Sequence, residues 1–363
     1  MLQLVPALDA GGVERATLEI ADALVAAGHR SLVVSAGGRL QALLEAGGST
    51  HVTLAIGRKS PWTLRHVRPL RRLIARERPD IVHARSRLPA WLALFALRGL
   101  RGPRPRFVTT VHGLNSPGRY SAVMTAGERV ICVSTTVRDY LLQHYPRLDP
   151  ARLRVIPRGI DADEFVPGRA TADWRQAFFA EFPALAGAPL LTLPGRGTRL
   201  KGHADAIALL ARLRAAGIDA RLLLLGAAEA GRRRYLDELR ALARDLAVDD
   251  AIAITPPRSD VAEVYAVSAL VLQLSRKPEA FGRTVLEALS CARPVLGYAH
   301  GGVGEQLATQ FPAGAVPPGD LDALTARAAA LLQAPPTVLP PRVPTGADMQ
   351  AATLALYREL ADA

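Results

Sequence analysis

The sequence predicts an α/β protein of two doubly wound, Rossmann-like domains that face a cleft, each a parallel sheet with helices on both faces. The chain has 363 residues, about twice the usual 150 of one domain. Short apolar runs alternate with helical patterns, which is typical of parallel sheets. The alternation stops once, over Phe165–Pro189, and then begins again. This stretch, rich in proline and glycine, is therefore expected to link the two domains.

Seven apolar runs in the first half predict strands, because turn residues bound each of them. They are Leu2–Pro6, Ser31–Ser35, Val52–Ala55, Ile81–Ala84, Phe107–Val111, Arg129–Val133 and Arg154–Pro157. Helical periodicity between the strands predicts five helices. These are Val13–Ala27, which Gly28 ends, and Gly38–Ala46, Trp62–Arg76, Ala90–Leu97 and Thr136–Gln143.

The second half repeats the pattern after a short linker helix at Ala172–Phe182. Strands are predicted at Leu190–Pro194, Ala220–Leu225, Ile252–Thr255, Leu270–Leu274 and Pro294–Gly297. Helices are predicted at His203–Ala215, Arg232–Leu246, Val261–Ala266, Thr284–Ser290 and Asp320–Leu332. A proline-rich stretch, Ala334–Pro344, precedes a last helix at Ala347–Leu360. Apolar residues recur along that helix, so it is expected to pack back on the first domain.

Composition excludes several classes of protein. The hydrophobic fraction of 49% and charged fraction of 21% exclude a mostly disordered chain. Only two cysteines occur, Cys132 and Cys291, so no disulfide framework is expected and the chain reads as intracellular. The start has no targeting pattern. The apolar run Leu88–Leu97 is ten residues long, far below the ~20 of a membrane span, and is expected to form a buried helix.

Glycines follow the first predicted strand. Gly11 and Gly12 open the first helix, where a tight turn exposes backbone amides to a phosphate; a plain turn without a ligand fits equally well. The dinucleotide fingerprint GxGxxG is absent there. A phosphate-loop motif is also absent, because His203 stands where its lysine should. Both absences argue against a nicotinamide oxidoreductase and a P-loop kinase.

Two further loops carry charge. Arg196 and Lys201 lie between the strand Leu190–Pro194 and the next helix, where two cations suit a diphosphate; a solvated basic loop is the alternative. Glu279 lies in the loop after Leu270–Leu274, and Glu287 lies one turn into the following helix. Between them, the amides of Phe281, Gly282 and Arg283 open that helix. One carboxylate suits sugar hydroxyls, the other suits ribose, and the amides suit a phosphate.

These residues resemble the retaining family-4 glycosyltransferases of GT-B fold. Glu279 to Glu287 (EAFGRTVLE) matches their Glu-x7-Glu motif. Further blocks follow in family order from residue 2 to about 332: GGVER at Gly11, VHG at Val111, VIPRGID at Val155, GR at Gly195 with KG at Lys201, and GGVGE at Gly301. The segment HARSRLPAW at His83 and the FGR variant at Phe281 resemble the branch that builds lipopolysaccharide core sugars.

The resemblance implies transfer of a sugar from a UDP-, GDP- or ADP-sugar, with retention, no cofactor and no catalytic metal. Residues 1–165 would bind the acceptor, with the helix over 347–363, and residues 166–346 the donor. Arg196 and Lys201 would bind the diphosphate, helped by Gly11, Gly12, the Phe281 and Gly282 amides and Arg283. Glu279 would contact the donor sugar and Glu287 the ribose. His112 would touch the donor sugar or the departing phosphate. Without the motif, His112 reads as a capping or core histidine. Arg258 would lie beside the base, although Thr-Pro-Pro-Arg replaces the usual Phe-x-Gly.

Positive charge gathers in one stretch. Residues 58–106 hold fourteen arginines and lysines against two acids, within a net charge of +12. Arg65, Arg68 and Arg72 recur at helical spacing, and Arg85 and Arg87 follow. We expect a surface for an anionic glycolipid or saccharide acceptor and for the inner face of the cytoplasmic membrane, where the protein would be peripheral. A solvated helix face is the alternative. Nucleic acid is not expected, because aromatic residues are 5% and no recognition motif occurs.

Two rival functions stay open at this point. The first is another enzyme of the same fold, a nucleotide-sugar epimerase or a sugar phosphorylase. The second is a non-catalytic basic protein that binds membranes or nucleic acid. An epimerase would have no use for the segment that begins at Glu279, which argues against the first rival. Salt-dependent DNA binding without nucleotide-sugar binding would favour the second.

Overall fold

The computed structural model describes residues 1–9, 11–340 and 344–362. The chain divides into two compact units, one of residues 1–159 and 344–363 and one of residues 160–343. The sequence places the division at residue 165, six positions later. Residues 341–343 of the expected proline-rich stretch lie outside the described residues.

The first unit is built on a parallel sheet of seven strands in the order β3-β2-β1-β4-β5-β6-β7. The strands are β1 (Leu2–Leu4), β2 (Leu32–Ser35), β3 (Thr50–Thr53), β4 (Ile81–Ala84), β5 (Arg106–Val111), β6 (Arg129–Cys132) and β7 (Leu153–Val155). Every residue of β1, β2 and β4 is buried, as a sheet covered on both faces requires. The order reverses between β1 and β4, which pair with each other through Leu2–Leu4 and residues 82–84. The loops after these two strands therefore leave the sheet in opposite directions.

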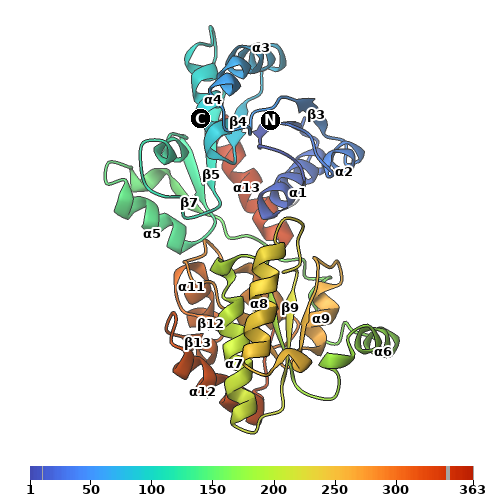
Figure 1. Cartoon of the computed structure of the whole chain (residues 1–363). Helices are drawn as coiled ribbons and strands as arrows, with labels where there is room; N and C mark the ends of the chain where they lie inside the picture. The colour runs from blue at the N-terminus through green and yellow to red at the C-terminus, as the bar shows by residue number, and fades with distance from the viewer. Residues whose placement is uncertain (10, 341–343, 363) are drawn as a thin grey trace. The chain divides into compact units, whose positions relative to one another are not determined.

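Helices cover both faces of this sheet (Figure 1). They are α1 (Gly12–Ala26), α2 (Gln41–Ala46), α3 (Val67–Glu77), α4 (Arg87–Arg98), α5 (Thr135–His144) and α13 (Gly346–Ala361). The expected helix Trp62–Arg76 is divided into a 3₁₀ turn, Pro61–His66, and α3. Pro69 explains the division, because proline is tolerated only in the first turn of an α-helix, which places the start of α3 at Val67.

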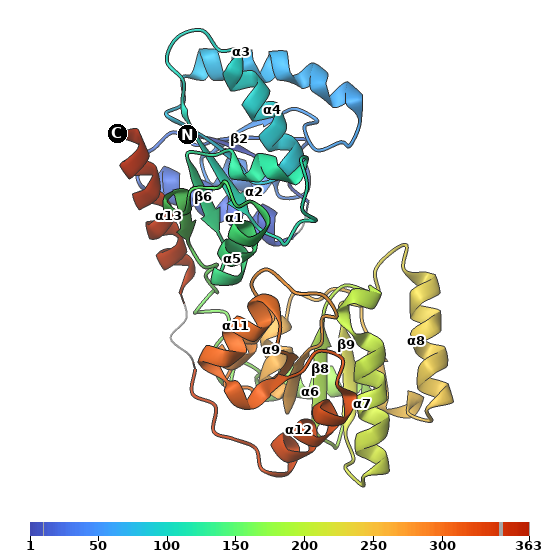
Figure 2. The same ribbon diagram turned by 90° about the vertical axis from the view of Figure 1, so that its left-hand side faces the viewer.

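The last helix, α13, completes the first unit. Thr345 and Asp348 form a reciprocal capping box at its start. Its apolar side chains pack with those of α1 and the sheet in one core cluster, among them Met349, Leu354, Leu356, Tyr357 and Leu360. Figures 1 and 2 both show α13 alongside α1. A segment near the end of the chain thus covers the strands formed by its beginning.

The second unit holds a parallel sheet of six strands in the order β10-β9-β8-β11-β12-β13. The strands are β8 (Leu190–Pro194), β9 (Arg221–Leu225), β10 (Ile252–Ile254), β11 (Leu270–Gln273), β12 (Val295–Tyr298) and β13 (Ala315–Val316). The helices are α6 (Ala172–Glu181), α7 (His203–Ala215), α8 (Arg233–Asp245), α9 (Val261–Val267), α10 (Arg283–Ser290), α11 (Gly301–Gln310) and α12 (Leu321–Gln333). Here the order reverses between β8 and β11.

The two parallel sheets with their helices confirm the predicted fold class. The strand β13 and the helix α11 were absent from the prediction, since α11 begins with the glycines Gly301, Gly302 and Gly304, which are poor helix formers. No helix in the described part of the chain is long and apolar enough to cross a membrane.

Candidate active site

The strongest candidate site lies where β8 and β11 end. These strands are neighbours in the sheet of the second unit, and the strand order reverses between them. The loops 195–202 and 274–282 leave their carboxyl ends. In open α/β sheets, ligands bind in the crevice formed at such a point. Both loops carry charged residues that the sequence singles out.

Glycines let the first loop lie close to its neighbours. Gly202 has a φ of 76°, and a Cβ there would lie 2.1 Å from the carbonyl oxygen of Leu274. A Cβ on Gly197 would lie 2.2 Å from the carbonyl oxygen of Ala227. Side chains essentially never fit at such distances. The close approach at Leu274 brings Lys201 beside the loop that follows β11.

Lys201 and Glu279 form an ion pair across the two loops. Lys201 Nζ lies 2.5 Å from Glu279 Oε1, and each side chain is 26% exposed. Ser275 Oγ also donates a hydrogen bond to Glu279 Oε1, and Gln273 Nε2 lies 3.4 Å from Glu279 Oε2. The Glu279 carbonyl accepts a bond of 2.7 Å from the amide of Gly302. The carboxylate and the ammonium are thus held in place before any substrate arrives.

Arg196 lacks an ion pair of the kind that holds Lys201, among the described residues. Its side chain is exposed, and no hydrogen bond or ion pair of its guanidinium occurs among the described residues. Its carbonyl accepts a bond of 2.7 Å from the amide of Thr198, which closes the turn. Arg196 is therefore a cation available to a phosphate at the edge of the same loop.

The helix α10 begins beside Glu279. Gly282 caps it with a φ of 80°. A Cβ on Gly302 would lie 2.5 Å from the backbone of Phe281, so the starts of α10 and α11 pack backbone to backbone. Phe281 itself is buried. The amides of Phe281, Gly282 and Arg283 stand at the start of α10, and a helix N-terminus favours an anion.

Glu287 lies one turn into α10. Its Oε1 accepts a hydrogen bond of 2.6 Å from Arg283 Nε, and the two side chains are 13% and 23% exposed. Glu287 is also placed close enough to the buried Tyr265 that its charge contributes to raising the pKa of that phenol, after the larger effect of burial. Arg283 therefore both neutralises and orients the carboxylate predicted to bind ribose.

The structure places Arg258 in a different group. Its guanidinium makes bonds of 2.8 Å to both carboxylate oxygens of Asp260 and pairs with Glu181 at 3.0 Å. It also lies over the rings of Phe178 and Phe182. The hydrogen bonds that Arg258 donates to Asp260 raise the pKa of the guanidinium above its ordinary value. These contacts fasten α6 to the loop after β10, an edge strand, so Arg258 is not brought together with Lys201 and Glu279.

Sequence reasoning missed the residues that support the two loops. His203 is fully buried at the start of α7. Burial lowers its pKa to about 4, against hydrogen bonds with the backbone of Thr198 and Gly195 that act in the opposite direction. His300 Nε2 lies 2.6 Å from the carbonyl oxygen of Ser275. These contacts depend on strand pairing, and their only signal in the sequence is a position just after a strand.

The first unit holds the remaining candidates at the carboxyl ends of its own strands. Gly11 has a φ of 141°, and a Cβ on Gly12 would lie 2.3 Å from Arg158 Nη1. His112 follows β5, and its Nδ1 lies 2.9 Å from Arg158 Nη2. Burial, with the nearby charges of Arg158, Arg85 and His83, holds the pKa of His112 well below its ordinary value. His112 is therefore neutral near pH 7.

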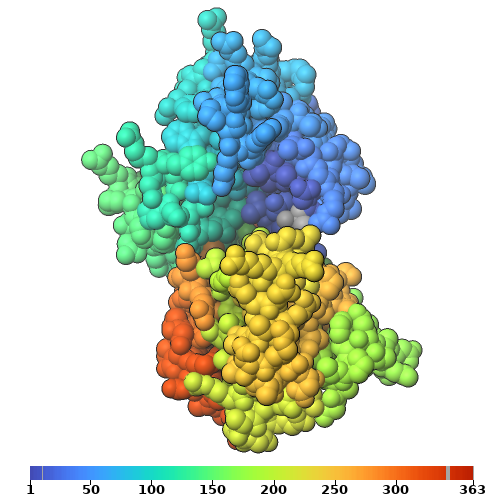
Figure 3. Space-filling model, viewed as in Figure 1, coloured from blue at the N-terminus to red at the C-terminus, as the bar shows by residue number. Residues whose placement is uncertain are grey.

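The arginines expected to form an acceptor surface divide into two sets. Arg65, Arg68 and Arg72 are exposed, on the segment that Figure 3 shows at the surface of the first unit. Trp62 and Leu64, 79% and 50% exposed, lie on the preceding turn. Arg87 is half-buried, donates to Ser121 Oγ at 3.2 Å and lies over the ring of Tyr120.

The prediction for Arg85 is wrong. Its side chain is 5% exposed, and its Nε donates a bond of 2.7 Å to Gln3 Oε1. Arg85 directly follows β4, an interior strand, and its amide still bonds to the carbonyl of Leu4 on β1. The ladder therefore continues through Arg85 and holds it inside, whereas the charge pattern alone suggested a surface.

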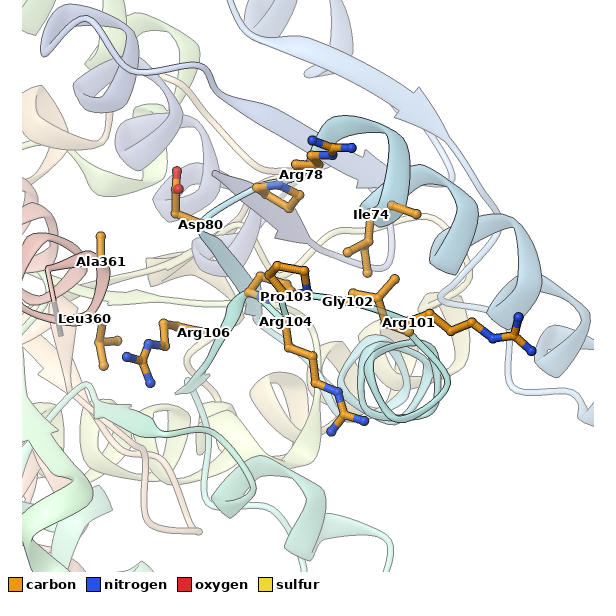
Figure 4. Close-up of a pocket in the computed structure, with 14 residues that line it drawn as sticks. Ile74, Arg78, Asp80, Arg101, Gly102, Pro103, Arg104, Arg106, Leu360 and Ala361 are labelled. Atoms are coloured by element: carbon orange, nitrogen blue, oxygen red, sulfur yellow. The ribbon is translucent and has the colours of Figure 1, made fainter.

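A pocket lies at the other end of the strands of this sheet, at their amino ends (Figure 4). This pocket has a volume of about 610 Å³. It lies where β4 and β5 begin, whereas His112 follows the end of β5. Its floor includes the buried Ile74 and Leu360. Cationic side chains surround it, namely Arg78, Arg101, Arg104 and Arg106, with one acid, Asp80.

Known families match both units. Residues 10–164 match the model of Glycosyltransferase Family 4, and residues 175–340 match that of Glycosyl transferases group 1. A solved glycosyltransferase from Rickettsia africae ESF-5 is 27% identical, with a TM-score of 0.84 over 99% of this chain and 97% of that one. HepE of Anabaena, in complex with UDP-glucose, is 19% identical, with a TM-score of 0.77 over 99% and 98%. At that identity the likeness shows the fold alone.

Curated relatives match over a shorter length. The D-inositol 3-phosphate glycosyltransferase of Actinosynnema mirum is 33% identical over 187 residues, which are 50% of this chain and 43% of that protein. The counterpart of Xylanimonas cellulosilytica is 32% identical over 186 residues, with the same shares. The match thus spans less than half the length of these relatives.

Fold and matches together define the class as the glycosyltransferases of GT-B fold. Within that class, this chain carries the domain pair of the family-4 glycosyltransferases, the Family 4 half in its first unit and the group 1 half in its second.

Proposed function

We propose that this protein transfers a sugar from a nucleotide-sugar to an anionic glycolipid or saccharide, with retention at the anomeric carbon and without a metal. The observation that carries the proposal is the Lys201–Glu279 pair at the strand reversal of the second unit, between the exposed Arg196 and the start of α10. A diphosphate, a sugar and a ribose are recognised by cations, amides and carboxylates, and each of these groups is present there.

Charge determines the chemistry at this site. When the glycosidic bond of the donor breaks, negative charge develops on the departing diphosphate. Lys201, Arg196 and the first amides of α10 are proposed to stabilise that charge, and a fixed donor of this kind is worth about 3 kcal/mol in the transition state. Lys201 is already held by Glu279, so little reorganisation accompanies the reaction.

Glu279 and Glu287 are proposed to accept hydroxyl groups of the donor. Glu279 would bind the sugar through Oε2, since Lys201 and Ser275 already occupy Oε1. Glu287 would bind the ribose, with its carboxylate held in place by Arg283. Because we assign no carboxylate as a nucleophile, we propose attack from the same face as departure. The leaving phosphate oxygen then takes the proton of the acceptor hydroxyl.

The acceptor is proposed to bind the first unit. Arg65, Arg68 and Arg72 with the exposed Trp62 suit an anionic amphiphile, because cations meet its charge while apolar side chains meet its lipid. The same cations would hold the protein on the inner face of the cytoplasmic membrane. The pocket of Figure 4 carries further arginines of the same unit. It lies at the sheet edge opposite His112, so it would hold a remote part of the acceptor rather than the reacting hydroxyl.

Names of similar proteins support an acceptor that carries phosphate. The curated relatives act on D-inositol 3-phosphate by name. A structural neighbour of 17% identity and TM-score 0.69, WaaG, is described as involved in lipopolysaccharide biosynthesis. We favour a lipopolysaccharide core or a related cell-envelope glycan, because the exposed Trp62 and Leu64 beside three arginines suit a lipid-linked acceptor. A free inositol phosphate is the second candidate.

A donor panel tests the proposal directly. Purified protein is heated with UDP-, GDP- and ADP-sugars, and one nucleotide is expected to raise the Tm. Transfer to a phosphorylated glycolipid is then followed by NMR, with EDTA present and absent. The anomeric proton of the product is expected to keep the donor's configuration. An inverted product, or loss of transfer in EDTA, would overturn the retaining or the metal-independent part. Binding of no nucleotide-sugar would overturn the whole.

A further inference from the structure

A small cavity lies inside the first unit, beyond the carboxyl ends of its central strands. Its volume is about 20 Å³, enough for one water molecule or one monatomic ion. Its walls come from α1, α13 and the ends of β4, β5, β6 and β7. The lining residues are Ala16, Ile20, His83, Arg85, Thr110, His112, Ile131, Val133, Ile156, Arg158, Met349 and Thr353.

Arg85 presents an unsatisfied donor to this cavity. The residue is 5% exposed, and its Nη2 has no hydrogen-bond partner among the described residues. Its Nε is bound to Gln3 Oε1 at 2.7 Å, and Gln3 is turned that way because its Nε2 donates to the carbonyl of Thr17. Gln3 is neutral, so it accepts a hydrogen bond without balancing the charge.

His112 presents a second unsatisfied donor. A guanidinium can only donate, so Arg158 Nη2 donates to His112 Nδ1, which must be unprotonated. The low pKa of His112 keeps the ring neutral, and its one proton is therefore on Nε2. That Nε2 is buried and has no acceptor in the described part of the chain. The tautomer follows from the contact with Arg158.

Of the other polar side chains of the wall, His83 and Thr353 are already engaged. His83 lies 2.6 Å from both Tyr357 Oη and Thr110 Oγ1, so its ring nitrogens are satisfied. Thr353 Oγ1 donates to the carbonyl of Met349 at 2.7 Å. None of the described residues that line the cavity is a carboxylate. Glu19 is near enough for its charge to act on Arg85, but it is not part of the wall.

We propose that this cavity is a binding site for one monovalent halide-sized anion, chloride under ordinary salt conditions, held by Arg85 Nη2 and the Nε2–H of His112. Both unmet groups are donors, and the cavity admits one atom. A water molecule would satisfy the two donors but would leave the buried charge of Arg85 uncompensated. An unbalanced buried cation is costly, and a halide removes that imbalance.

The ion would have a consequence for His112. By accepting the Nε2 proton it holds the ring in one tautomer and one orientation, so Arg85 and the ion act on His112 together. This inference does not depend on the proposed reaction, because it concerns only the interior of the first unit.

Bromide tests the site in the unmodified protein. Crystals of the full chain grown in bromide are expected to show an anomalous peak within hydrogen-bond distance of Arg85 Nη2 and His112 Nε2. In solution, replacing gluconate by chloride or bromide at constant ionic strength is expected to raise the Tm along a saturating curve. Density for a water molecule with no bromide signal would overturn the proposal, as would superimposable gluconate and chloride curves.

Variants assign the effect to Arg85. Arg85→Gln is expected to abolish the halide-dependent rise in Tm. Arg98→Gln is the matched control, because Arg98 ends the adjacent α4, is exposed and loses the same charge, and its response is expected to equal that of the wild type. An Arg85→Gln protein that keeps the full response would overturn the assignment. Should that variant not fold, the bromide measurement on the wild type decides the question.

Discussion

At the scale of residues, the candidate site is a set of charges fixed by contacts with their neighbours. Lys201 and Glu279 come from loops 78 positions apart, and they meet because β8 and β11 are adjacent. Their pairing is half-buried, and such pairs add little to stability, typically below about 1 kcal/mol. The pair is therefore better explained by binding than by folding.

Lys201→Ala and Glu279→Ala are each expected to lower the rate of transfer by about 100-fold or more, since one fixed donor to a developing charge is worth about 3 kcal/mol. The Tm of each variant should stay within a few degrees of the wild type. Turnover is measured on purified protein with folding checked by circular dichroism. Arg199→Ala is the control, because Arg199 lies in the same loop and pairs with Glu238 instead. Wild-type turnover in either alanine variant would refute the assignment.

Glu287→Ala is expected to weaken donor binding more than it slows turnover. The ribose is remote from the reacting bond, so its hydroxyls contribute binding in the ground state and the transition state alike. Titration of donor by calorimetry measures the affinity, and steady-state kinetics separate KM from kcat. An unchanged donor affinity would remove the ribose role from Glu287.

At the scale of elements, strands and most helices were predictable from the sequence, because each strand is a short apolar run between turn residues. The charged loops after β8 and β11 were predictable for the same reason. Ser275 and Gln273 were not, since the path of the loop after β11 brings them to Glu279. His300 was not, since its contact with Ser275 depends on the pairing of β11 with β12. Arg85 was misplaced because charge pattern does not show where a strand ladder ends. The helix α11 was missed because its first residues are glycines.

His203 supports the basic loop, and its low pKa predicts a dependence on pH. Its folded pKa of about 4 lies below the 6.5 of an unfolded histidine. The unfolded chain therefore binds the extra proton between these values, so stability is full above pH 6.5 and falls as the pH drops toward 4. The contribution lost is about 3 kcal/mol. Urea unfolding of wild type and His203→Gln from pH 4 to 7 should show a flatter profile for the variant. Parallel profiles would contradict this role.

Tyr357 links α13 to the sheet through His83. Tyr357→Phe is expected to destabilise the first unit by about 1–3 kcal/mol, because it removes the hydroxyl partner of a buried imidazole nitrogen without changing the apolar packing. Denaturant unfolding measures the change. Tyr145→Phe is the control, since Tyr145 is partly exposed and its hydroxyl makes only a long contact, 3.5 Å, with the carbonyl of Gly118. An effect no larger than that of the control would show that the His83 contact is dispensable.

At the scale of the whole molecule, the two units differ in how far acids balance their exposed arginines. Acids pair with many arginines of the second unit, such as Arg214 with Asp250 and Arg276 with Asp205. In the first unit, Arg65, Arg68 and Arg72 make no ion pair with any described residue. Of the chain's net charge of +12, the part on α3 and its preceding turn is thus free to act on a partner.

Reversing the charge of α3 and its preceding turn tests whether that partner is an anionic membrane. Each cation near such a surface contributes about 1 kcal/mol, so changing Arg65, Arg68 and Arg72 together to glutamate should weaken binding to anionic vesicles by more than about 100-fold. Binding is measured by sedimentation at low and high salt, and wild-type binding should fall with salt because screening shortens the reach of charge. The control reverses Arg233, Arg234 and Arg240 on α8, which are also exposed and change the net charge by the same amount, although Arg234 and Arg240 pair with Glu238 and Asp237. Since the two triple variants have the same net charge, equal loss of binding in both would mean that net charge alone drives association. Equal binding of the wild type to neutral and anionic vesicles would instead remove the membrane from the proposal. The proposed transfer reaction would remain, with an acceptor that reaches the protein without a charged membrane surface.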